Sequence, residues 1–333
     1  MHDRGSKQAQ VADCTVRLEP HRHDELHREL DDWRANVGAP VAVDAAPAAP
    51  SRLEGIDVLC WNVAIGLGRL EALLERLRAA SFGGVGTRPE RPLVVLAQEA
   101  YRSDASIPDD AGGPHHGGRM PRSTPRTDVV AEARRLGLSV RYSPSMRNGS
   151  AASDRGNAIL STARLDDAHA FLLPYVRQRR VVVSARLAGH SGLTFVSAHL
   201  DTHGRARHPE PRRFGGGRAF QAAALGRAFD DIVPPDGTLV LGADLNTFFG
   251  MSDPAIRALV AAGMHPARRV GGWRHTFHTP VKLLLDHVMY RCPAGRIAQA
   301  EVVRIDEAPG DRSRGVFGSD HHPLLARIEL NGH

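Results

Sequence analysis

The pattern of apolar and polar positions changes character near residue 54. From there on, short apolar runs of strand length alternate with stretches of helical periodicity. The predicted strands are 56–63, 93–99, 138–143, 157–161, 179–187, 193–200, 238–244, 284–290, 300–305 and 323–330. The predicted helices are 68–80, 125–137, 217–231 and 253–262. Some strands follow one another without a helix between them, as in 179–200, which excludes a purely alternating βα barrel and favours mixed sheets.

Residues 1–53 have a different texture. Leu26, Leu30, Trp33 and Val37 recur at helical spacing and predict one amphipathic helix over about residues 21–37. The following Pro/Ala-rich stretch is typical of a stiff linker. We therefore expect an N-terminal extension over residues 1–53 and a catalytic domain over residues 54–333. The helix either packs back onto that domain or acts as an arm for a partner.

Composition places the chain among soluble proteins. Of its 333 residues, 42% are hydrophobic and 24% are charged, and no apolar run approaches the ~20 residues of a membrane-spanning helix. The N-terminus lacks the apolar region of a secretory signal, and the three cysteines form no motif. These observations predict a cytoplasmic protein without disulfides.

The net charge of +6 favours anionic partners such as nucleic acid, phospholipid or phosphorylated metabolites. Residues 112–155 hold eight arginines against three acidic residues, so the excess is concentrated locally. We expect a polyanion to bind the arginine-bearing segments around 119–155 and 205–218. A solvated basic face is the alternative interpretation.

Polar residues gather where the predicted apolar strands end. They are Asn62, Gln98 with Glu99, His199, Asp244 with Asn246, Asp286, and Asp320 with His321. Each group alone fits an ordinary turn or a solvated strand end. Ligands of α/β folds bind at strand ends, where side chains from distant parts of the sequence converge. The joint occurrence of these groups therefore predicts one site.

The motifs WN, QE, GNAILS, HLD, GADLN, LDHV and SDHHP occur in this order over roughly residues 56–330. In this order they resemble the endonuclease/exonuclease/phosphatase superfamily, which includes pancreatic-type DNases, inositol polyphosphate 5-phosphatases and neutral sphingomyelinases. The resemblance implies an α/β fold of the DNase type, a four-layer sandwich of two mixed β-sheets flanked by helices. The histidine of HLD disfavours an abasic-site endonuclease, and the signature of the 5-phosphatases is absent.

The resemblance also implies roles for individual residues. Glu99 resembles the main Mg²⁺ ligand, and Asn62 and Asp320 resemble further residues of the metal site; Mn²⁺ is a possible substitute. Mg²⁺ prefers such oxygen ligands and uses few carboxylates together with substrate phosphate.

The remaining residues resemble the family's groups for water and phosphate. Asp244 resembles the group that orients or deprotonates the attacking water, and Asn246 one that hydrogen-bonds the phosphate. His321 and Asp286 resemble a His–Asp pair, and His199 a second histidine at the phosphate. Arg102 and Arg155 are candidates for a phosphate contact, with a surface role equally open.

These expectations predict a metal-dependent hydrolase of phosphate esters. A phosphodiesterase or nuclease acting on DNA or RNA comes first, and a phosphomonoesterase or lipid-headgroup phosphodiesterase second. A non-catalytic binding module on the same fold is remote, because none of the site residues is missing. No Cys/His cluster for tight zinc binding is apparent in the sequence.

Overall fold

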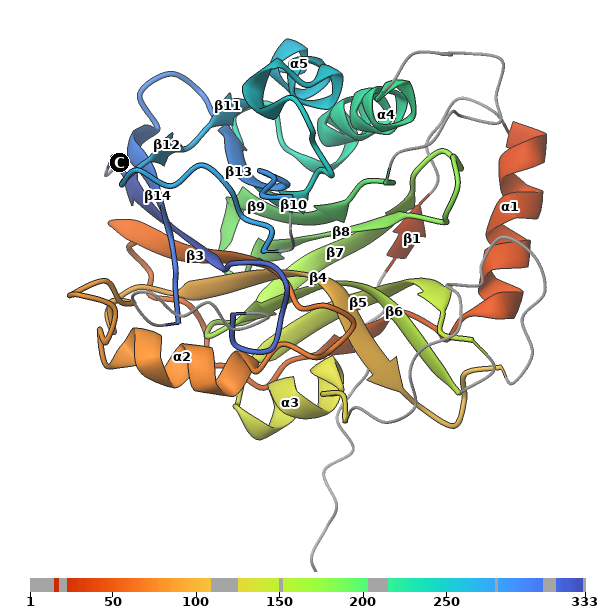
Figure 1. Cartoon of the computed structure of the whole chain (residues 1–333), viewed down its shortest axis with the longest axis horizontal. Coiled ribbons are helices and arrows are strands. Elements are labelled where there is room, and N and C mark those ends of the chain that lie inside the picture. The colour runs from red at the N-terminus through yellow and green to blue at the C-terminus, as the bar shows by residue number, and fades with distance from the viewer. Residues whose placement is uncertain are drawn as a thin grey trace, which may run out of the picture.

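The computed structural model describes residues 15–17, 23–108, 125–149, 152–202, 215–278, 281–307 and 316–331. Its strands form two mixed sheets (Figure 1). The eight-stranded sheet has the order β12-β14-β15-β3-β4-β6-β5-β2. Its strands are β12 (Arg268–Arg269), β14 (Ile297–Arg304), β15 (Leu324–Leu330), β3 (Gly55–Asn62), β4 (Leu93–Ser103), β6 (Ser153–Ser161), β5 (Ser139–Arg147) and β2 (Val41–Val43).

The seven-stranded sheet has the order β1-β7-β8-β9-β10-β13-β11. Its strands are β1 (Thr15–Arg17), β7 (Leu165–Leu172), β8 (Val181–Leu187), β9 (His190–His199), β10 (Thr238–Asp244), β13 (Asp286–Arg291) and β11 (His265–Pro266). The helices are α1 (His23–Asn36), α2 (Leu70–Arg78), α3 (Val129–Arg135), α4 (Gly216–Ile232) and α5 (Pro254–Ala261), with a short 3₁₀ turn at Gly250–Ser252.

The two sheets pack face to face, with helices on their outer faces. Helices α2 and α3 cover the eight-stranded sheet, and α4 and α5 cover the seven-stranded sheet (Figure 1). The predicted four-layer sandwich of two mixed sheets flanked by helices is therefore confirmed. Among the described residues, no helix is long and apolar enough to cross a membrane.

Strand β3 shows why the sequence forms this sandwich. Ile56, Val58 and Cys60 belong to the core between the sheets, whereas Leu59 and Trp61 belong to the core beneath α2 and α3. A strand buried on both faces is apolar throughout, and its alternate residues serve different layers. The parallel pairs β3 with β4 and β9 with β10 therefore bring their last inward-facing residues to one end of the space between the sheets, and antiparallel β13 brings its first residue there.

The sheets approach each other closely at Gly242 of β10. A Cβ atom there would lie 2.7 Å from Leu96 Cδ1 and 3.1 Å from Cys60 Cβ. No side chain fits at this point, so glycine in GADLN is required by packing. This close approach sets the spacing of the strand ends that follow immediately after it.

Five strands were not predicted from the sequence: β1, β2, β7, β11 and β12. Strand β7 was not predicted, because Asp166, Asp167 and His169 interrupt its apolar pattern and a bulge breaks its pairing with β8. Strand β2 lies within the stretch predicted to be a linker and pairs antiparallel with β5. A three-residue edge strand has no sequence signal that distinguishes it from an extended linker.

Helix α1 packs onto the edge of the sandwich. Leu30, Trp33 and Val37 are buried in a cluster with Ala170, Leu172 and Val181. The Trp33 indole Nε1 donates a hydrogen bond of 3.1 Å to the Pro144 carbonyl of the other sheet. The helix thus packs back onto the domain, the first of the two alternatives. The division between an extension and a catalytic domain at residue 54 stays a prediction about which residues the activity requires.

We expect Trp33→Ala to lower the free energy of unfolding by about 3–5 kcal/mol, because it leaves a cavity that α1 alone cannot close. Urea denaturation of the full chain measures this value. Asp31→Ala on the exposed face of the same helix is the matched control, since the Asp31 side chain is 77% exposed, and should change stability by at most about 0.5 kcal/mol. Equal effects of the two substitutions would show that the helix contributes no packing energy.

Candidate active site

The register of three strands places three functional side chains next to one another. Asp244, the last residue of β10, lies opposite His199 of the parallel strand β9 and opposite Asp286 of the antiparallel strand β13. Asn62 ends β3 in the other sheet, and its Nδ2 donates to Asp244 Oδ2 over 2.9 Å. Both sheets therefore contribute to one polar cluster at the end of the space between them.

Asp244 is the centre of this cluster. Its Oδ2 lies 3.3 Å from His199 Nε2 and 3.8 Å from His321 Nε2, and its Oδ1 accepts a hydrogen bond from the Asn246 backbone. Burial, together with the nearby charge of Asp286, raises the pKa of Asp244 to about 7, although the charge of His321 and the bond from Asn62 act in the opposite direction. A carboxyl group with this pKa can accept a proton near neutral pH.

His321 and Asp286 form the predicted pair. His321 Nδ1 lies 2.8 Å from Asp286 Oδ2. Burial alone would lower the pKa of His321, but the charge and hydrogen bond of Asp286, with the charges of Asp244 and Asp320, raise it to about 10. The imidazole is therefore a cation at neutral pH. Its backbone carbonyl accepts a hydrogen bond of 2.9 Å from the Trp61 indole, which fixes the loop against the core.

His199 has the opposite electrostatic character. Burial, followed by the charges of Arg180, His321 and Arg155, holds its pKa well below the usual range. Arg180 NH1 lies 3.1 Å from His199 Nδ1. A guanidinium group only donates hydrogen bonds, so Nδ1 is the acceptor in this contact, while Nε2 faces Asp244 and the Asn246 amide. Sequence reasoning missed Arg180, whose only signal was an arginine pair directly before a strand.

Asn246 reaches the site through a turn rather than through strand alternation. Its backbone φ of 50° lies in the left-handed region, two residues after β10 ends. Its Nδ2 donates to the Leu200 carbonyl at 2.9 Å and lies 3.0 Å from His199 Nε2. Asparagine tolerates this conformation better than most residues. The turn therefore places Asn246 on the same side as Asp244, against His199.

Glu99 is placed by a β-bulge. The pairing of β4 with β6 shifts between Ala97 and Ala100, and Glu99 has a φ of 52°. Gln98 faces the space between the sheets, where it bonds Ser197, and Glu99 lies on the same side with Oε1 3.9 Å from His199 Nδ1. Bulges next to active sites commonly re-aim a side chain in this way.

Asp320 precedes His321 and is partly buried. Burial raises the pKa of its carboxyl group, the charge of His321 lowers it, and the charge of Glu99 raises it again. The charge of Glu99 thus acts on Asp320, so the two carboxylates lie within electrostatic reach of each other. Asp244, Asp286 and His321 also lie close enough together to share an ion.

The two candidate arginines have different positions. The charge of Arg155 acts on both Glu99 and His199, which places it at the edge of the site. Arg102 is 4% exposed, and its guanidinium group bonds Asp154 and the Ala39 carbonyl. The structure therefore gives Arg102 a packing role in place of the predicted phosphate contact.

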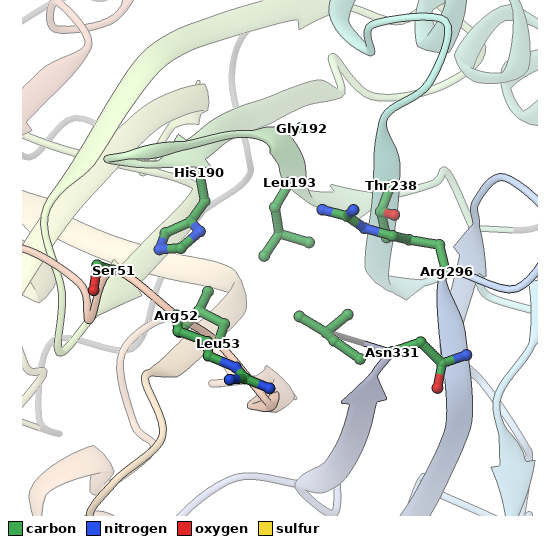
Figure 2. A pocket seen from close by; sticks show the side chains of 10 residues that line it. Ser51, Arg52, Leu53, His190, Gly192, Leu193, Thr238, Arg296 and Asn331 are labelled. Carbon is green, nitrogen blue, oxygen red and sulfur yellow. The ribbon is translucent and has the colours of Figure 1, made fainter. Parts of the chain in front are cut away.

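A pocket of about 260 Å³ lies at the opposite end of the sandwich (Figure 2). It is lined by Leu193 and Thr238, near the start of β9 and at the start of β10, together with His190, Arg52 and Arg296. None of the polar residues described above lines it. The site thus coincides with the ends of the strands and not with this hollow.

Comparisons with known proteins agree with this fold. The family model described as "Endonuclease/Exonuclease/phosphatase family" matches residues 59–321. The catalytic domain of human Nocturnin, solved with a bound sulfate anion, aligns with a TM-score of 0.52 and 15% identity over 88% of this chain and 97% of its own. An endonuclease/exonuclease/phosphatase from Bacteroides vulgatus aligns with a TM-score of 0.52 and 14% identity over 83% and 99% of the two chains. A comparison with curated protein sequences found no match.

A protein of the Leptotrichia buccalis endonuclease/exonuclease/phosphatase family aligns similarly, with a TM-score of 0.51 and 13% identity over 83% of this chain and 99% of its own. At such identities the structures establish the fold alone. The family model covers most of the chain, so the fold and the site define a phosphoesterase of the DNase-like class. The chain belongs to the endonuclease/exonuclease/phosphatase family.

We expect the two histidines to differ in charge at pH 7, with His321 protonated and His199 neutral. Imidazole NMR spectra across a pH series measure this directly. Asp286→Asn should lower the pKa of His321 by about 1–3 pH units, because it removes the paired anion. His265→Ala, at an exposed position on β11, should leave both titrations unchanged. A neutral His321 at pH 7 in the unaltered chain would contradict the pairing.

Proposed function

We propose that this protein is a metal-dependent phosphodiesterase that hydrolyses its substrate by attack of water on phosphorus. The observation that carries the proposal is the pair of buried histidines on either side of Asp244, one charged and one neutral. Hydrolysis of a phosphate ester requires an oriented water, neutralisation of the phosphoryl oxygens and protonation of the leaving group. Asp244 can take a proton from the water, positive side chains can neutralise the phosphoryl oxygens, and the imidazolium of His321 can give a proton to the leaving oxygen.

Asp244 is the group for the water. Its raised pKa and central position suit it to accept a proton from a water molecule held beside the phosphorus. Asn62 holds its Oδ2 by a hydrogen bond, and the Asn246 backbone holds its Oδ1. Both carboxylate oxygens are therefore fixed in orientation before substrate arrives.

His321 and His199 are the groups for the phosphate. The imidazolium of His321, fixed by Asp286, carries a positive charge that stabilises the developing negative charge on the phosphoryl oxygens. The neutral His199 is held by Arg180 at Nδ1 and lies beside Asp244 and Asn246 through Nε2. Arg155 and Arg180 add positive charge at the edge of the site, where a phosphate diester would lie.

Glu99 and Asp320 are the proposed ligands of a divalent cation. Glu99 remains partly exposed at 26%, and the mutual repulsion of the two carboxylates suits a hard cation with oxygen ligands. The Oδ1 atom of Asn62 accepts one hydrogen bond, from the Ala64 amide, and retains a second lone pair for such an ion. A bound Mg²⁺ or Mn²⁺ ion would act as a Lewis acid on a phosphoryl oxygen.

Activity should therefore need Mg²⁺ or Mn²⁺ and be lost in excess EDTA. We expect Glu99→Gln and Asp320→Asn each to lower kcat/KM for bis(p-nitrophenyl) phosphate by at least about 10²-fold, because a metal Lewis acid contributes several kcal/mol. Glu90→Gln, which removes an exposed carboxylate beyond the site, is the matched control. Full activity of the unaltered chain in EDTA would exclude the metal.

Nucleic acid is the proposed substrate, supported by the net charge and by the basic residues around Glu99. Arg126 and Arg155 both lie within electrostatic reach of this carboxylate. Within the arginine-bearing segments predicted from the sequence, Arg141, Arg147 and Arg218 are buried, whereas Arg134 and Arg135 are exposed. The arginines of these segments that fall in residues 109–124 and 203–214 lie outside the described residues.

The substrate is tested by a salt series. If DNA is cleaved, its KM should rise steeply with salt, with a slope of about 0.9 per phosphate contact, whereas a small diester should show a shallow slope. Arg126→Ala should reduce the DNA slope by about one, and Arg78→Ala on the exposed face of α2 should not change it. A flat DNA series with intact hydrolysis of the small diester would exclude nucleic acid and retain the phosphodiesterase.

One observation favours a lipid-headgroup phosphodiesterase as the second candidate. Phe248, Phe249 and Met251 are 37%, 55% and 41% exposed, and they follow Asn246 directly in the chain. Exposed apolar side chains beside a catalytic cluster suit an apolar part of the substrate. Hydrolysis of sphingomyelin vesicles that falls with Phe249→Ser, without a change toward the small diester, would support this candidate.

A further inference from the structure

We infer that the protein has a second metal site, formed by His275, His278 and His322 and suited to a transition-metal ion such as Zn²⁺. The three histidines each offer a ring nitrogen, and these atoms all lie within 4.8 Å of one another. His275 and His278 belong to the segment before β13, and His322 follows the catalytic His321. This site is independent of the proposed phosphodiesterase activity and of the carboxylates Glu99 and Asp320.

The separation of the ring nitrogens fits a tetrahedral ion. His278 Nδ1 lies 3.2 Å from His322 Nε2. With Zn–N bonds of ~2.0–2.1 Å, two ligands of a tetrahedral zinc ion lie about 3.3 Å apart. The rings of His275 and His278 both meet the ring of His322 in T-shaped geometry, with centroids 5.6 and 5.2 Å away. Three imidazoles that converge in this way resemble a ligand set more closely than a stack.

Asp306 gives His322 the tautomer that a metal ligand needs. His322 Nδ1 lies 2.7 Å from Asp306 Oδ1. The proton of the neutral ring therefore lies on Nδ1, and the lone pair of Nε2 faces His278. Metal-binding histidines usually donate their other ring N–H to a carboxylate, which fixes the ring and raises its basicity. Asp306 occupies that supporting position.

Two cations lie near the cluster and limit its affinity. Arg304 NH1 lies 3.1 Å from His275 Nε2, and its NH2 pairs with Asp306 Oδ2 over 2.9 Å. The charge of Lys282 also reaches His275. Asp306 offsets one of these charges. A site with three neutral imidazoles and this surrounding charge should bind more weakly than a closed structural zinc site.

The cluster joins the segments that support the catalytic pair. The His278 amide donates to the Asp320 carbonyl over 2.8 Å, and the His322 amide donates to the Thr276 carbonyl over 2.7 Å. Thr276 Oγ1 in turn accepts hydrogen bonds of 3.0 Å from the amides of Leu285 and Asp286. An ion at the three histidines would tie residues 275–278 to the loop that carries His321, and would stabilise the folded protein.

The sequence shows no Cys/His cluster for tight zinc binding, yet the fold brings three histidines together. His278 and His322 are 44 residues apart in the chain, and no short spacing motif announces them. Their proximity arises because Phe277 and His321 form a bridge between two antiparallel segments. Only the fold reveals the site.

The site is tested with the full chain after removal of metal by chelation. Equilibrium dialysis against Zn²⁺ should give one more tightly bound equivalent in the unaltered protein than in His278→Ala or His275→Ala. The difference is the measurement, because the chain has eighteen histidines and others can bind zinc weakly. Asp306→Asn should weaken this one equivalent by about 10–100-fold, as loss of an outer-shell carboxylate does.

Co²⁺ serves as a spectroscopic probe of the same site. The unaltered protein should show the visible bands of Co²⁺ in a low-coordinate imidazole site, and His278→Ala should lose them. His265→Ala, an exposed histidine outside the cluster, and Glu99→Gln should both retain the bands. Zn²⁺ should also raise the Tm of the unaltered protein and not that of His278→Ala.

Three results would overturn the proposal. The first is equal zinc binding by the unaltered chain and both histidine variants, with circular dichroism showing that the variants are folded. The second is loss of the Co²⁺ bands in Glu99→Gln and not in His278→Ala, which would place the ion at the catalytic carboxylates. The third is the absence of any tightly bound equivalent in the unaltered chain, which would leave His278 and His322 as an N–H···N hydrogen bond.

Discussion

Charge balance around Asp244 is the constraint on which the site depends. Asp244 and Asp286 are both 1% exposed, and each is an anion that is costly to bury without a partner. The imidazolium of His321 lies between them, at 2.8 Å from Asp286 and 3.8 Å from Asp244. The surrounding structure therefore has to hold His321 in place. The Trp61 indole donates a hydrogen bond to the His321 carbonyl, and Ser319 Oγ accepts one from the His321 amide. Thr276 Oγ1 accepts one from the amide of Asp286, the partner of His321.

The space between the sheets changes gradually from apolar to polar to charged side chains as it approaches this cluster. Between the sheets, the core is apolar up to Cys60, Leu96 and Val240. The next layer is polar but internally satisfied: Gln98 donates to Ser197 and to the carbonyls of Leu96 and Gly242. The charged residues come only after this layer. Buried polar groups that satisfy one another add specificity without leaving unpaired atoms, so the amide layer separates the hydrophobic core from the site and fixes the two sheets relative to each other.

The consecutive histidines His321 and His322 lie at this end of the space between the sheets and face different neighbours. His321 faces Asp244 and Asp286, and His322 meets Asp306 and His278. Successive residues of an extended segment point to opposite sides, so His321 faces two carboxylates while Nε2 of His322 faces His278. The same short loop can therefore support phosphoryl chemistry on one side and a borderline metal ion on the other.

The sequence by itself determined the central strands and the order of the polar residues at their ends. Strand β10 has the predicted limits, because its apolar run is buried on both faces and admits no other element. Tertiary structure decided the partners. Arg102 turned inward to Asp154 and Arg180 turned toward His199, although both are arginines beside strands. The bulge at Glu99 and the meeting of His278 with His322 likewise depend on contacts between distant segments. Periodicity records which positions are buried, whereas the partner of a buried polar group is set by the register and approach of other elements, which a single sequence does not contain.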